Sequence, residues 1–222
     1  MIKTFILASA LLSSPLLAAE SPSEIETLKK IKQHMATYYD QHKGMESKRS
    51  VVVEERDPEE NTILLTKNIE RQVKVFINKN RETETLSCSI DGKSVDIDDC
   101  EDMGSKEPYH PLFGKKSSKF YLYDLKPQND GTWLLKISPK DNTSRHFMGT
   151  LSFDKNLRLT KQEGTIADIP FPLKSLALNI KYKPFGDLDL IDEGRYDILL
   201  KIPLVLHKKM TVKFKASEQK VL

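Results

Sequence analysis

From residue 49 onward, apolar and polar residues alternate in short runs, and this period of two constrains the fold more than any other feature. Such alternation is typical of β-strands with one buried face. The turn signals between the runs include Asp91-Gly92 and Asn129-Asp130-Gly131. Short strands joined by short turns, with no helical pattern among them, indicate an antiparallel meander. We expect strands at 49–56, 62–67, 71–77, 84–89, 119–125, 132–138, 147–153, 158–166, 176–182, 196–206 and 210–215, with Pro203 at an edge or bulge.

One helix is predicted ahead of the strands, at 22–40, where Ser23 can serve as the N-cap. Its apolar residues recur at steps of three and four and so share one face. We expect this face to pack on the sheet; a helix lying on a membrane surface is the alternative. The fold class is α+β and mostly antiparallel, with a strongly curved half-barrel sheet of about eleven strands and the helix on its concave side. The apolar face consists of Ile25, Leu28, Ile31, Met35 and Tyr39.

The N-terminus has the pattern of a cleavable secretory signal: Lys3, an apolar run from Phe5 to Leu17, and then Ala18-Ala19. The run is too short for a spanning helix, although an uncleaved anchor is the alternative. We expect a signal peptide at 1–19, a single domain at 20–222, and a periplasmic monomer. The 35 basic and 32 acidic residues argue against a nucleic-acid partner, since phosphate binding needs a basic surplus. Residues 81–110 hold 3 basic and 9 acidic residues, whereas 172–222 hold 10 and 6, an asymmetry that could orient a partner.

Cys88 and Cys100 are the only cysteines, and they flank the Asp91-Gly92 turn signal. In an oxidising compartment, such a pair predicts a disulfide. Free thiols are the main alternative. A metal site is weakly indicated, because no histidine accompanies the pair at ligand spacing.

Candidate catalytic chemistry is sparse. His34 and His42 flank Asp40 without sharing a helix face, so they make a poor metal site. The acidic run at 96–102 supplies oxygen ligands of the kind calcium prefers, but it lacks the spacing of an EF-hand loop. The chain has neither a Gly-x-Ser-x-Gly nor a His-Glu-x-x-His motif. We therefore expect a protein that is not an enzyme and has no cofactor, catalytic residue or metal. An envelope hydrolase is the alternative to this expectation.

Several predicted strands are apolar on both faces, notably 119–125 and 132–138. Either the helix and the irregular segment 98–118 cover the second face, or the sheet encloses an apolar hollow. The candidate ligand-binding residues alternate along successive strands and are expected mostly to share the concave side: Val73, Val75, Phe120, Leu122, Trp133, Leu135, Leu151, Phe153, Leu178 and Ile180.

The chain resembles the LolA-like group of exported bacterial proteins, within the branch of outer-membrane lipoprotein-sorting proteins. The resemblance lies in the order of the predicted elements and in their residue pattern across residues 22–216. The segments that carry it are His110-Pro111-Leu112-Phe113, the strand 120–125, Gly149-Thr150-Leu151-Ser152-Phe153-Asp154 and Pro172-Leu173-Lys174-Ser175-Leu176.

This resemblance implies a half-open antiparallel barrel whose apolar hollow receives the acyl chains of lipids or lipoproteins. It also implies an arginine that ties a lid shut, for which Arg49 is the candidate in this chain. The expected function is a periplasmic lipid-binding or chaperone role in outer-membrane lipid or lipoprotein transport. An inner- or outer-membrane protein could be a further partner. The alternative is an envelope protein–protein interaction or sensor module with the same fold and no carried cargo.

Overall fold

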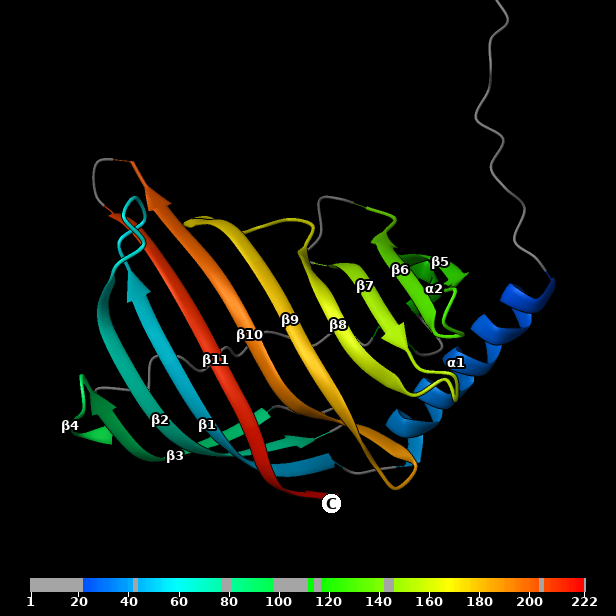
Figure 1. Ribbon diagram of the computed structural model, residues 1–222, viewed down its shortest axis with the longest axis horizontal. Helices are drawn as coiled ribbons and strands as arrows, with labels where there is room; N and C mark the ends of the chain where they lie inside the picture. Colours follow the sequence, from blue (N-terminus) through cyan, green and yellow to red (C-terminus); the bar gives the residue numbers. More distant parts are fainter. Residues whose placement is uncertain are drawn as a thin grey trace, which may run out of the picture.

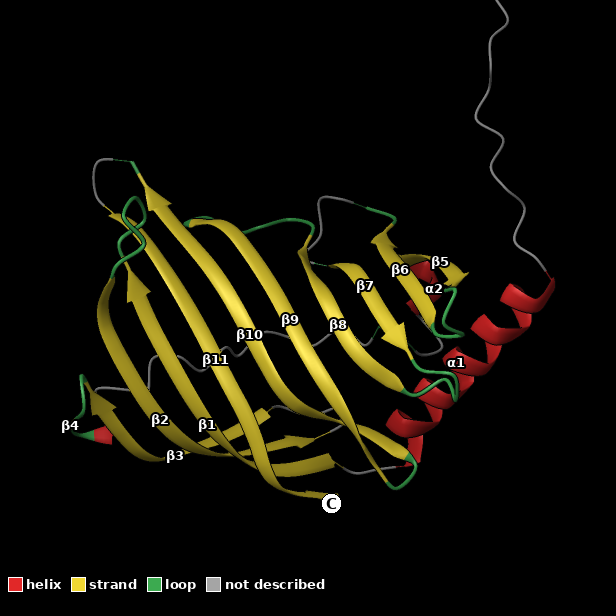
Figure 2. Cartoon of the chain, viewed as in Figure 1, coloured by secondary structure: helices red, strands yellow, loops and turns green. Residues whose placement is uncertain are grey.

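A computed structural model describes residues 22–41, 44–76, 81–97, 112–113, 117–141, 146–203 and 206–221. In this part of the chain, one long helix precedes an antiparallel sheet of eleven strands, and the sheet is curved and open (Figures 1 and 2). The elements are α1 (Pro22–Gln41), β1 (Gly44–Arg56), β2 (Ile63–Phe76), β3 (Arg81–Ile90), β4 (Lys93–Ser94), α2 (Ser117–Phe120), β5 (Tyr121–Pro127), β6 (Trp133–Pro139), β7 (Phe147–Phe153), β8 (Leu159–Ile166), β9 (Leu173–Phe185), β10 (Leu188–Ile202) and β11 (Leu206–Val221).

The strands are ordered β4-β3-β2-β1-β11-β10-β9-β8-β7-β6-β5 across the sheet. Neighbours in sequence are therefore neighbours in space, except that β1 pairs with β11 and joins the two halves of the chain. In that pairing Val53 lies opposite Val212, and Val51 lies opposite Phe214. The sheet opens between its edge strands β4 and β5, which belong to consecutive parts of the sequence.

The pairing register assigns every side chain of the regular strands to one of two faces, because residues opposite each other in an antiparallel pair point to the same side. We call the concave side that contacts α1 the inner face, and the opposite side the outer face. On β9, the inner residues Leu176, Leu178 and Ile180 are partly or fully buried. Their outer neighbours Ala177 and Lys181 are exposed. On this strand the inner face is therefore apolar, and the outer face is more polar.

The predicted helix at 22–40 and most of the predicted strands are confirmed. Several predicted strand limits were wrong. The predicted strands 62–67 and 71–77 are joined in one strand, β2 (Ile63–Phe76), whose inner positions Lys67 and Arg71 interrupt the apolar alternation. Pro203 lies in a turn after the end of β10, because its ring nitrogen cannot donate to a ladder and the strand ends at Ile202.

Helix α1 packs on the inner face at the β5 end of the sheet (Figure 2). Ile31 is fully buried there, and Leu28 and Met35 of the same helix face pack beside it. Ile25 is 55% exposed, so the apolar stripe packs on the sheet from Leu28 to Met35. The side chain of Tyr39 lies outside the described residues. No helix within the described ranges is both long enough and apolar enough to span a bilayer.

Candidate functional site

The inner face is filled with side chains at the β5–β8 end. Residues from the helix, from the segment before α2 and from the strands interlock there in one cluster that is at most 8% exposed. The hydroxyl of Tyr123 donates to the carbonyl oxygen of Leu112 at 2.7 Å and holds this segment against β5. This filled cluster consists of Ile31, Leu112, Phe113, Tyr121, Leu125, Leu135, Ile137, Phe147, Leu151, Phe153 and Leu159.

The inner face is apolar but only partly buried where it continues across β9, β10, β11 and β1. The register aligns Leu178 with Tyr196 and Val212, and Leu176 with Ile198 and Met210. We call this region the open inner surface. Its partly exposed members are Val51, Leu176, Leu178, Tyr196, Ile198, Leu200, Met210 and Val212.

An aromatic cluster closes one end of the open inner surface. Phe214 stacks on Tyr196 with 5.6 Å between ring centroids. The guanidinium of Arg49 lies 5.6 Å from the Phe214 centroid, within the range of a cation–π contact. Arg71 is the partner of Arg49 in the β1–β2 register and is 6% exposed. Two guanidinium groups therefore share the inner face beside the apolar residues.

The structure divides the ten predicted binding residues between different environments. Leu135, Leu151 and Phe153 belong to the filled cluster, and Trp133 and Leu178 pack against it. Val73 and Ile180 are buried on the inner face. The expected placement of two residues was wrong: Phe120 ends α2 and is 39% exposed, and Leu122 is 56% exposed on the outer face of β5. The inner residues of β5 are Tyr121, Tyr123 and Leu125, and the side chain of Val75 lies outside the described residues.

Sequence reasoning missed most of the open inner surface. Ile198, Leu200, Met210 and Val212 lay in predicted strands, but Leu199 interrupts the apolar–polar alternation between the first two. The missing signal was the pairing of β1 with β11, which places the C-terminal strands at the centre of the sheet.

The histidines, acidic residues and cysteines that the sequence singled out contribute less to a candidate site than the inner face does. His34 lies on α1, with Nε2 3.8 Å from Asp189 Oδ2 on β10. Within the described ranges, His, Cys, Asp and Glu side chains do not gather in groups of three that could hold a metal ion. The side chains of Asp40 and His42, and all of residues 98–102, lie outside the described residues. Cys88 is buried on β3, whereas Cys100 lies outside, so the disulfide stays a prediction.

Comparisons with known proteins add little to this geometry. No family model matches the chain, and a search of curated proteins finds no match. Among solved structures, the chain is similar to a crystal structure of a DUF1329 family protein from Desulfovibrio piger. The identity is 9%, the TM-score is 0.45, and the match covers 89% of this chain and 93% of that one.

Proposed function

We propose that the protein binds an acyl chain, or another elongated apolar ligand, along the open inner surface. The observation that carries the proposal is the row of aligned apolar side chains that stays partly exposed on the concave side, next to a cluster that is already filled. A continuous row of partly exposed apolar side chains is the kind of surface that marks an interaction site. Each methylene group that a ligand buries there contributes about 0.8 kcal/mol, so binding needs no catalytic group.

The proposed setting is the periplasm, reached through a signal peptide cleaved after Ala19, with lipid or lipoprotein traffic as the context. The sequence pattern at 1–19 and the resemblance to lipoprotein-sorting proteins support this part of the proposal. N-terminal sequencing of the protein recovered by osmotic release tests it. A chain that begins at Glu20 is the expected result, and an intact Met1 in the membrane fraction would exclude it.

The binding proposal is tested with two adjacent, partly buried residues of β10 that point to opposite faces. Ile198 is on the inner face, and Leu199 is on the outer face. Glutamate at position 198 places a carboxylate where the acyl chain would lie, and desolvating it is costly. We expect Ile198→Glu to weaken binding of palmitate at least tenfold in a calorimetric titration. The matched variant Leu199→Glu should bind as the parent protein does.

Native mass spectrometry of the protein purified from its own compartment complements the titration. The mass of a lipid that co-purifies with the protein would support the proposed binding of an acyl chain. Equal affinities of the two variants for palmitate would exclude the open inner surface as the binding site.

The filled cluster favours a second function, an envelope interaction or sensor module without cargo. Five of the ten residues first expected to bind ligand belong to this cluster or pack against it, next to α1. Under this alternative the open inner surface docks a partner protein. A protein without lipid that co-purifies with a stoichiometric partner, and that loses this partner in Ile198→Glu, would support it.

A further inference from the structure

We infer that the outer face of β8–β11 docks on anionic phospholipid membranes. Between the bulge of β10 at Ile191/Glu193 and the end of that strand, the register places seven basic and three acidic side chains on this face. The C-terminal charge surplus seen in the sequence is therefore concentrated on one side of the sheet. We call the seven the basic face; they are Lys161, Lys181, Arg195, Lys201, Lys209, Lys213 and Lys215.

Ion pairs inside the sheet neutralise only part of this charge. Each of the three acidic residues contacts one member of the basic face: Glu163 pairs with Lys161, Glu193 with Lys181, and Asp197 with Arg195. Lys213 pairs with Glu54 of β1 at 2.7 Å. Among the described residues, Lys201 and Lys215 form no ion pair, so positive charge remains for an external partner.

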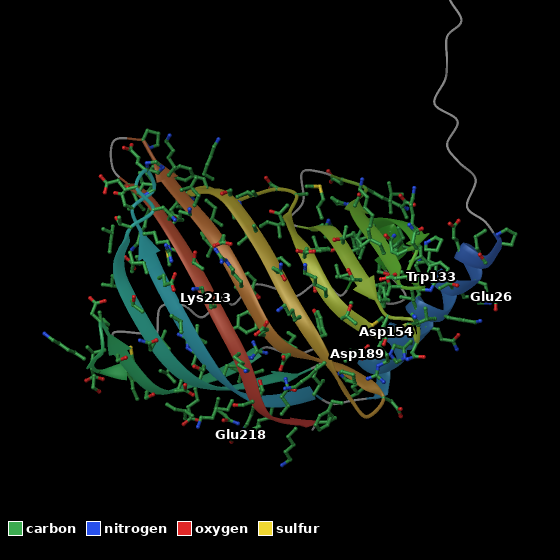
Figure 3. The ribbon with its side chains drawn as sticks, viewed as in Figure 1. Glu26, Trp133, Asp154, Asp189, Lys213 and Glu218 are labelled. Carbon is green, nitrogen blue, oxygen red and sulfur yellow. The ribbon has the colours of Figure 1, made fainter. Side chains whose placement is uncertain are left out.

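A groove of about 440 Å³ crosses this face between β9 and β1. Four basic side chains line it, together with one carboxylate, and Figure 3 shows Lys213 on β11 near the middle of the sheet. Lysine stems can supply apolar walls. The ammonium groups of Lys181 and Lys213 are held by carboxylates, whereas Lys215 forms no ion pair among the described residues. Such a groove suits a phosphate group on a glycerol backbone. The charged lining residues are Lys181, Arg195, Lys213, Lys215 and Glu193.

The arrangement fits a lipid surface better than a nucleic acid. The basic face spreads over four neighbouring strands, which span about 14 Å at the usual strand spacing. Its outer positions, all within the described residues, carry no Phe, Tyr or Trp on which bases could stack. Phe214, which lines the groove, is buried and stacks on Tyr196 of the inner face. Basic clusters bind anionic bilayers through the summed attraction of separate charges. This inference does not rest on ligand binding at the inner face.

The test is sedimentation of the protein with vesicles of phosphatidylglycerol mixed into phosphatidylcholine. Lys215→Glu reverses a charge in the groove without breaking an ion pair among the described residues. Lys136→Glu is the matched control, since it reverses an exposed lysine on the outer face of β6, five strands away from β11. We expect Lys215→Glu to weaken vesicle binding roughly tenfold, and Lys136→Glu to change it less than about threefold. All variants keep the same N-terminus, so any contribution of residues 1–21 is common to them.

Further measurements decide the inference. Binding should fall steeply when salt rises to about 0.5 M, and it should be absent on pure phosphatidylcholine. Competition by inorganic phosphate would indicate a site for free phosphate, and overturn the membrane assignment. Equal binding of the Lys215→Glu and Lys136→Glu variants, or binding to single-stranded DNA tighter than to vesicles, would overturn it as well. Palmitate titration of Lys215→Glu should match the parent, which separates this result from the inner-face proposal.

Discussion

Arg158 Nε lies 2.5 Å from Asp189 Oδ1, and this ion pair fixes the β9–β10 hairpin to the start of β8. The Asp189 side chain is 3% exposed and also accepts a hydrogen bond from the backbone N–H of Leu159 at 2.9 Å. Arg158 in turn donates to the carbonyl oxygens of Gly186 and Leu188. Figure 3 places Asp189 near α1, so the ion pair lies where the helix, β8 and the hairpin meet.

Asp189→Ala should lower the free energy of unfolding by about 3 kcal/mol, because it leaves the half-buried Arg158 guanidinium without its carboxylate. Asp124→Ala is the control: it breaks an exposed pair with Lys126, in which Asp124 is 52% exposed, and should cost under about 1 kcal/mol. Urea denaturation of both variants measures the difference. Equal losses of unfolding free energy would mean that the ion pair does not stabilise the contact between β8 and the β9–β10 hairpin.

The sequence predicted the fold class because alternation and turn signals are local properties. Between Leu176 and Tyr182 of β9, large apolar inner residues alternate with small or polar outer residues, and the predicted strand was confirmed. In the predicted strand 119–125, Phe120 and Leu122 alternate with Tyr121, Tyr123 and Leu125, so the sequence pattern did not decide which set faces α1. Contacts with Ile31 and Phe113 bury Tyr121 and Leu125, and these contacts depend on segments distant in sequence. The open inner surface was missed for the same reason, since it depends on the pairing of β1 with β11.

Glu54 should make stability depend on pH in the acid range. Its carboxylate accepts a hydrogen bond from Lys213 Nζ at 2.7 Å and another from Arg56 Nη2 at 2.5 Å. The bond from Lys213, and then that from Arg56, lowers the pKa of Glu54 below its ordinary value of 4.5. The stabilisation is therefore fully present above about pH 4.5 and is lost as the pH falls through the folded-state pKa.

The Glu54→Gln variant tests this pH dependence. At neutral pH it should be about 1 kcal/mol less stable than the parent, and the gap should close as the pH falls below about 4. Chemical denaturation at a series of pH values measures it. Glu84→Gln, at an exposed position of β3, controls for the loss of a carboxylate and should change stability by under about 0.5 kcal/mol. A gap for Glu54→Gln that stays constant with pH would contradict the assignment.

Gly149 is required by a close approach of two strands. It pairs with Gly164 across β7 and β8, and the Phe147 ring covers both glycines. A Cβ atom at position 149 would lie 2.0 Å from the carbonyl oxygen of Glu163, and the paired backbone cannot retreat without breaking the ladder. Gly149→Ala should therefore cost about 2–3 kcal/mol in unfolding free energy.

Gly186→Ala is the comparison for Gly149→Ala. Gly186 has a φ of 57° and open space around its Cβ position, so alanine there meets only backbone strain, at about 1 kcal/mol. Thermal unfolding of the two variants ranks them. A smaller loss for Gly149→Ala than for Gly186→Ala would show that β7 and β8 can separate freely.

The predicted Cys88–Cys100 disulfide should be measurable as a loop constraint. Cys88 is 5% exposed and packs with Val53 and Ile69 on the inner face of the sheet. A bond to Cys100 would close a short loop and restrict the unfolded chain by about 3 kcal/mol. Alkylation of denatured protein without reductant should add no label, and alkylation after reduction should add two.

Cys100→Ala should lose the loop constraint alone. Cys88→Ala should lose it and also leave a cavity beside Ile69, so it should be the less stable variant. Two labelled thiols in freshly isolated protein would contradict the disulfide, and equal stability of the reduced and oxidised protein would contradict its constraint on the loop.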